Sequence, residues 1–229
     1  MTLPAYLPVD FIYLILQLVL IYLISRCVIN ELFLLLLDLF GNQKLVYNLL
    51  ALFFLPGTII HELSHFLAAT VLFLRVRSFS IWPQWQNNHL KLGSVVYEKK
   101  DLLRSILVGI APLFGGLAFF LFLANFNIFP QINWLVNLFL LYLIFVVSVN
   151  MFSSKKDLQD LLFLIPLSLI AGLVIYIFNL PIDLVFNNGF WHNIIIIFRR
   201  INIYLLLSLG INLGFWLILK FTGRLIKKS

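Results

Sequence analysis

One stretch of the sequence indicates both the fold and the chemistry: Pro56-Gly57-Thr58-Ile59-Ile60-His61-Glu62-Leu63-Ser64-His65-Phe66-Leu67-Ala68-Ala69. It lies within an apolar run from Leu45 to Leu74, in which His61, Glu62 and His65 are the only acidic, basic or histidine side chains. Such groups are costly at membrane depth, so their presence there indicates a functional site.

These three residues form an HExxH pattern, which is typical of zinc hydrolases. Residues four apart lie on one face of an α-helix, so His61 and His65 can bind the same metal ion. Glu62 lies beside them, where it can take a proton from a water molecule that the metal activates. The pattern predicts a zinc site inside a membrane helix. The competing interpretation is that these side chains only form hydrogen bonds between helices.

The composition of the whole chain is that of an integral membrane protein. Its 229 residues are 62% hydrophobic and 11% charged, with a mean hydropathy of +1.05, whereas a soluble domain is about 25% charged. The net charge of +7 falls in short clusters beside apolar runs, which is the positive-inside pattern and argues against nucleic-acid binding. Residues 1–10 contain no Lys or Arg, which argues against a cleaved signal peptide.

Hydropathy predicts an all-α membrane fold, a polytopic bundle of about six to seven transmembrane helices with a small β-hairpin after the motif helix. Residues 31–55 are interpreted as one irregular span, and Pro56-Gly57 as a break before the motif helix. Residues 181–200 are expected to be an interfacial or partly inserted segment. The spans are expected at about 11–29, 31–55, 58–74, 102–124, 134–150, 161–178 and 203–221.

The hairpin and the charges together predict the orientation. Apolar and polar residues alternate over 76–82 and 89–97, on either side of Asn87-Asn88, which favours a β-hairpin. With the N-terminus outside and seven spans, the basic residues of the hairpin region, Lys155-Lys156 and the C-terminal tail fall inside. We therefore expect the active site toward the cytoplasmic side, most simply of a bacterial inner (plasma) membrane.

A zinc hydrolase needs a third protein ligand besides two histidines. The later part of the chain offers Asp157, Asp160, Asp183 and His192. Asp157 is preferred and Asp160 is the alternative, because both lie where the chain re-enters the membrane. Asp183 and His192 lie in a segment whose placement is less defined.

Three further residues are candidates for positioning the substrate. Asn150 can orient a substrate carbonyl or a ligand, and it can equally be a polar residue at a helix end. Pro112 and Gly115 lie in the helix after the hairpin, where a kink and close helix packing are the simpler interpretation.

The sequence resembles the site-2 protease family of intramembrane zinc metalloproteases, in its compact branch without PDZ or CBS domains. The resemblance covers about residues 45–165 and rests on the 56–69 stretch, a strand-like segment at 78–83, Gly109-Ile110-Ala111-Pro112-Leu113-Phe114-Gly115-Gly116 and an Asn150…Asp157 element. It implies zinc ligands His61, His65 and Asp157, with Glu62 as the base. The family's usual Leu-Asp-Gly third-ligand motif is replaced by Ser154-Lys155-Lys156-Asp157, which fits the Ser-x-x-Asp form of related small families.

These observations predict one membrane domain over 1–229, with a metalloprotease-like core at about 45–165 and additional C-terminal helices at about 166–229. The predicted function is zinc-dependent hydrolysis of a peptide bond in or near a transmembrane segment of a membrane protein. The alternative is a non-proteolytic membrane protein that binds partners or assists assembly on the same scaffold. A transporter is less favoured, because a path for a solute across the membrane would need more polar residues in the spans than this single cluster. The sequence leaves the oligomeric state open.

Overall fold

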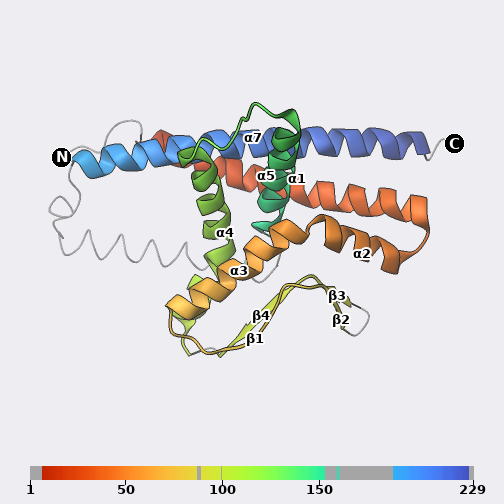
Figure 1. Cartoon of the computed structure of the whole chain (residues 1–229), viewed down its shortest axis with the longest axis horizontal. Coiled ribbons are helices and arrows are strands. Elements are labelled where there is room, and N and C mark those ends of the chain that lie inside the picture. The colour runs from red at the N-terminus through yellow and green to blue at the C-terminus, as the bar shows by residue number, and fades with distance from the viewer. Residues whose placement is uncertain (1–6, 87–88, 99, 153–158, 160–187, 227–229) are drawn as a thin grey trace.

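The computed structural model describes residues 7–86, 89–98, 100–152, 159 and 188–226 (Figure 1). Within these residues the chain is mostly helical, and three helical segments are long and apolar enough to cross a membrane: Val9–Phe40, Leu102–Asn125 and Asn193–Leu225. The helix pair that contains the motif makes a fourth if it is counted as one bent span. The mainly helical architecture is therefore as predicted, whereas the described residues supply three or four of the expected six to seven spans. The span expected at 161–178 lies outside them.

The two longest helices lie side by side and run in the same direction (Figure 1). Helix α1 spans Leu7–Phe40 and helix α7 spans Asn188–Ile226. Near their starts, the Arg199 guanidinium lies 3.3 Å from the Asp10 carboxylate. Further along both helices, Val28 and Leu219 belong to one apolar cluster. Helices α4 (Leu102–Asn125) and α5 (Trp134–Asn150) cross this pair, so the described helices do not form a simple parallel bundle.

The expected span at 31–55 is wrong, because residues 31–40 continue α1 without interruption. No Pro or Gly occurs between residues 11 and 40, so nothing in the sequence stops the helix there. It ends at Gly41, whose φ of 64° is the left-handed conformation that commonly terminates helices. Helix α2 (Gln43–Phe53) then begins, and the Asn42 side chain caps it by accepting hydrogen bonds from the backbone N–H groups of Lys44 and Leu45.

The motif helix α3 (Leu55–Val71) follows α2 after a bend of 68°. Pro56 lies in the first turn of α3, where its missing N–H has no intrahelical partner to lose. The Pro56-Gly57 pair therefore lies in the first turn of the motif helix, and the break lies two residues before Pro56, at Phe54.

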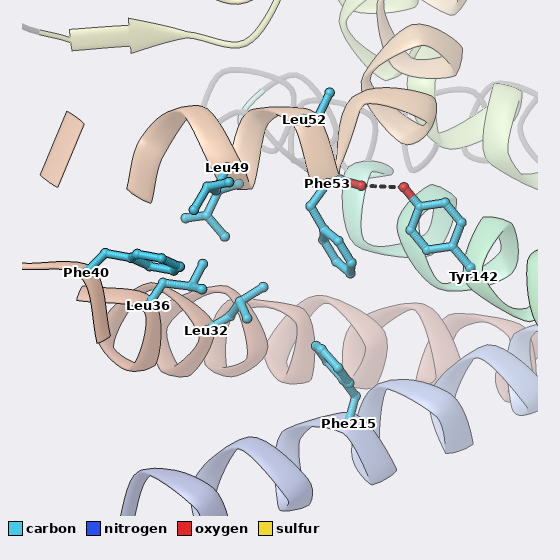
Figure 2. Close-up of a pocket in the computed structure, with 9 residues that line it drawn as sticks. Leu32, Leu36, Phe40, Leu49, Leu52, Phe53, Tyr142 and Phe215 are labelled. Carbon is cyan, nitrogen blue, oxygen red and sulfur yellow. Dashed lines mark hydrogen bonds between the residues drawn. The ribbon is translucent and has the colours of Figure 1, made fainter. Parts of the chain in front are cut away.

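A tyrosine from α5 holds the bend between α2 and α3. The Tyr142 hydroxyl donates a 2.6 Å hydrogen bond to the carbonyl oxygen of Phe53, the last residue of α2 (Figure 2). The carbonyl groups at a helix end lack intrahelical donors, and this hydroxyl supplies one.

Beside the bond, an apolar cavity of about 550 Å³ is lined by leucine and phenylalanine side chains of α1 and α2 together with Tyr142 and Phe215.

The predicted hairpin is present and covers residues 76–97 as two antiparallel ladders. Strand β1 (Val76–Ser80) pairs with β4 (Ser94–Tyr97), and β2 (Gln84–Gln86) pairs with β3 (His89–Lys91). The ribbon is interrupted between the ladders, at residues 81–83 on one side and 92–93 on the other. At this interruption, Gly93 lies against the Glu62 side chain of the motif helix.

The two helices beyond the hairpin begin where the sequence predicts. The Asp101 side chain caps α4 by accepting a 2.8 Å hydrogen bond from the Arg104 backbone N–H, and α5 has the predicted bounds. Residues 188–200 of the segment expected to be interfacial or partly inserted form the first part of α7, which continues without a break into the span expected at 203–221. Their position relative to the membrane stays a prediction.

We predict that Tyr142→Phe destabilises the chain by about 1–2 kcal/mol, because the Phe53 carbonyl loses its hydrogen-bond donor. Thermal unfolding of the detergent-solubilised chain measures this. Tyr13→Phe is the matched control, since it removes a hydroxyl from a side chain that is 54% exposed. Equal melting temperatures for the two variants would contradict a role for Tyr142 at the bend.

Candidate metal centre

The two histidines of the motif present their rings on the same side of α3. The centroids of the His61 and His65 rings lie 4.8 Å apart, and the planes are nearly perpendicular, at 86°. The two Nε2 atoms approach to 3.2 Å. His61 is 5% exposed and His65 is partly buried. The pair therefore converges on one point in the protein interior.

A backbone carbonyl orients each ring from the other side. The Nδ1 atom of His61 lies 2.8 Å from the carbonyl oxygen of Asn150, and that of His65 lies 2.8 Å from the carbonyl oxygen of Val108. A carbonyl oxygen can only accept a hydrogen bond, so both Nδ1 atoms must donate. In the neutral rings the proton then sits on Nδ1, and Nε2 is the nitrogen that can bind a metal.

This arrangement suits a metal ion held by both rings. Two Nε2 lone pairs facing each other at 3.2 Å repel unless a cation or a shared proton lies between them. Two nitrogen ligands about 2.0–2.1 Å from a tetrahedral zinc ion lie roughly 3.3 Å apart. The separation of the two Nε2 atoms therefore matches that of two ligands of a tetrahedral zinc ion.

Asn150 is fixed by α3 and by its own helix. Its side-chain Nδ2 donates to the Val146 carbonyl oxygen at 2.8 Å, and the Thr58 hydroxyl lies 3.5 Å from its Oδ1. Asn150 is the last residue of α5, so its carbonyl has no intrahelical donor and can accept from His61. Asn150 thus acts on the site through its backbone, while its side chain ties α5 to α3.

Glycines allow the helices that carry these carbonyls to approach α3 closely. A Cβ atom at Gly57 would collide with the Val146 carbonyl oxygen and the Asn150 side chain. A Cβ atom at Gly115 of α4 would collide with the Ser64 hydroxyl. Because no Cβ is present at either position, α5 and α4 reach the histidines.

The hairpin covers Glu62. This side chain is 8% exposed, and a Cβ atom at Gly93 would lie 2.6 Å from its Cγ and 2.9 Å from its Oε1. Gly93 lies in the interruption between β3 and β4, so the hairpin backbone itself forms the wall next to the carboxylate. Glu62 is thus shielded from bulk water.

Comparison with known proteins yields no match: no protein-family model, curated protein or solved structure is similar to this chain. The function must therefore be inferred from the residues of the site.

The predicted third ligands, Asp157 and Asp160, lie outside the described residues, as does Asp183. Within the described residues, no group of three or more His, Cys, Asp or Glu side chains is placed to hold a metal ion. His192 belongs to the first turns of α7.

The three residues predicted to position the substrate lie at contacts with α3 or beside them. Asn150 and Gly115 pack against α3 directly, and Pro112 follows Val108 by one helical turn. Contact between any of them and a substrate stays a prediction. Sequence patterns did not reveal the roles of Val108 and Gly93 in the site. Val108 acts through its backbone carbonyl, and Gly93 acts by leaving room for the Glu62 side chain. The only sequence signal for Val108 is the proline four residues later.

We predict that Gly57→Ala destabilises the chain by about 1–3 kcal/mol, because the added methyl group forces α5 away from α3. Gly210→Ala is the matched control, since a Cβ atom there meets nothing within 4 Å. That control should be neutral or stabilising by up to about 1 kcal/mol. Thermal unfolding compares the two, and equal responses would contradict the close approach at Gly57.

Proposed function

We propose that this chain is an intramembrane zinc metalloprotease, which hydrolyses a peptide bond in or near a transmembrane segment of a membrane protein. The observation that carries the proposal is the convergence of two Nε2 atoms to 3.2 Å, with both Nδ1 atoms held by carbonyl oxygens. Glu62, which follows His61 in the sequence, is buried as well. Two imidazoles and an adjacent glutamate supply two of the three protein ligands and the base of a metal-assisted hydrolysis.

The chain's own residues divide the chemistry between them. His61 and His65 would hold zinc, with Asp157 or Asp160 as the proposed third ligand. Zinc supplies a Lewis acid that polarises the scissile carbonyl and activates water. The Glu62 carboxylate accepts the proton of the attacking water and returns it to the leaving amide nitrogen. Burial of Glu62 against Gly93 keeps this proton transfer away from bulk water.

The substrate must reach Glu62 in an extended form. A peptide bond in a transmembrane helix is hydrogen-bonded and shielded, so a helical segment has to unwind before it is cleaved. The hairpin offers strand edges, and its interruption at residues 92–93 lies against Glu62. We propose that the unwound segment pairs with the hairpin beside this interruption.

The membrane setting is part of the same proposal. Long apolar helices carry large exposed hydrophobic side chains such as Leu16, Leu107 and Leu217, which suit a hydrocarbon environment. The basic clusters favour a cytoplasmic position for the hairpin by the positive-inside rule. We propose a multi-pass protein of a bacterial inner membrane that belongs to the compact branch of the site-2 proteases.

We predict that the purified full chain binds about one zinc ion, and that Glu62→Gln keeps this metal while its cleavage rate falls by about 10²–10⁴-fold. The amide is nearly isosteric but cannot accept the proton. Metal content is measured by mass spectrometry. Cleavage is followed as shorter fragments of single-span membrane proteins co-expressed with the chain.

Glu98→Gln is the matched control, because it makes the same change in a carboxylate that pairs with Arg77 on the hairpin. It should leave metal content and cleavage unchanged. A wild-type chain that binds no zinc, or a Glu62→Gln variant that cleaves like wild type, would contradict the protease. The latter result would favour the alternative of a non-proteolytic partner-binding protein.

The third ligand has a separate test. Asp157→Ala should lower the zinc content far below one per chain, whereas Asp160→Ala should retain it, because a tetrahedral hydrolase site uses three protein ligands. Both variants remove one carboxylate from the same segment, so each serves as control for the other. Retention in Asp157→Ala with loss in Asp160→Ala would transfer the ligand role to Asp160.

A further inference from the structure

The two carbonyls that orient the histidines are available for different reasons. Asn150 ends α5, so its carbonyl has no donor further along the helix. Val108 lies inside α4, seven positions into a helix of 24 residues, where a carbonyl normally accepts from the N–H four residues later. Its 2.8 Å contact with the Nδ1 atom of His65 therefore needs an explanation.

The explanation is the residue at position 112. Four residues after Val108 the helix carries Pro112, which has no N–H to donate. A proline ring inside a helix also displaces the carbonyl four residues before it. Val108 is fully buried and Pro112 is buried too, so water is not at hand to satisfy this carbonyl. The Nδ1–H group of His65 supplies the donor from the neighbouring helix.

We infer that Pro112 is a positioning residue for His65: by withholding its N–H from the Val108 carbonyl, it keeps that carbonyl free to fix the His65 ring. The proline thereby holds the proton of the neutral ring on Nδ1 and directs Nε2 toward His61. The value of this arrangement for metal binding rests on the proposed function. The arrangement itself rests on the geometry of α3 and α4.

If Pro112 served only to bend α4, its replacement would leave the His65 tautomer unchanged. Gly115 and Gly116 lie one turn later, so Pro112 could in principle shape the helix alone. Pro112→Ala separates the two roles. It restores an N–H that competes with His65 for the Val108 carbonyl. Alanine is also the more favourable residue inside a helix, so the variant is expected to fold.

The test uses the full chain, purified in detergent, free of metal and labelled with ¹⁵N-histidine. His65→Gln identifies the His65 ring signals. In the wild type, the neutral His65 ring should carry its proton on Nδ1. In Pro112→Ala the ring should become a mixture of the two tautomers. Zinc affinity, measured by competition with a chromophoric chelator, should weaken about tenfold or more, because the partner that orients a ligand has been removed.

Pro56→Ala is the matched control. It makes the same substitution in the first turn of α3, where an N–H has no intrahelical acceptor, and it should leave the His65 tautomer as in the wild type. A Pro112→Ala variant with an unchanged tautomer would overturn the role of Pro112, even if zinc binding and cleavage stand. Failure of the wild type to bind zinc would instead overturn the proposed function. The tautomer would still decide the role of Pro112.

Discussion

The candidate site depends on a matched pair of hydrogen bonds from histidine Nδ1 atoms to backbone carbonyl oxygens. These bonds join α3 to the end of α5 through Asn150 and to the middle of α4 through Val108. They fix the orientation of both rings, and so they determine that the Nε2 atoms face each other. A metal ion bound by two flexible imidazoles would have to order them on binding. Here the rings are ordered by the protein fold.

The pair of bonds in turn depends on close helix packing. Gly57 admits α5, and Gly115 admits α4, to distances at which a Cβ atom would collide. Packing without a hydrophobic driving force between helices relies on small residues of this kind. Gly93 extends the same device to the hairpin, whose backbone reaches the Glu62 side chain. Because these three positions are glycines, two helices and the hairpin can pack closely around one short stretch of α3.

The bend between α2 and α3 separates the site helix from the long helices. Helix α2 packs with α1 and α7 in one apolar cluster that includes Val46, Leu50 and Leu219. Helix α3 leaves this cluster at 68° and joins α4, α5 and the hairpin. The Tyr142 hydroxyl satisfies the carbonyl that the bend exposes. Helices α4 and α5 pack against α3 and also against the two long helices, so they join the site to the apolar body of the chain.

Local sequence signals determined much of this protein. The HExxH spacing put two imidazoles on one helical face, Asp101 marked the start of α4, and the alternation around residues 87–88 gave the hairpin. These features follow from helical and strand periodicity and from capping, which act over a few residues. The same reasoning failed at residues 31–55. There, hydropathy indicated where apolar residues occur but not where the helix stops.

Only the tertiary structure decided which groups surround the motif. Every residue has a carbonyl, and although Pro112 leaves that of Val108 without a helical donor, no residue type shows that His65 and His61 are the groups that donate to Val108 and Asn150. Likewise, a glycine in the sequence does not reveal which side chain will fill the space beside it, as Glu62 does at Gly93. Periodicity set the face on which the histidines lie. The packing of distant segments against that face set the direction in which each ring points.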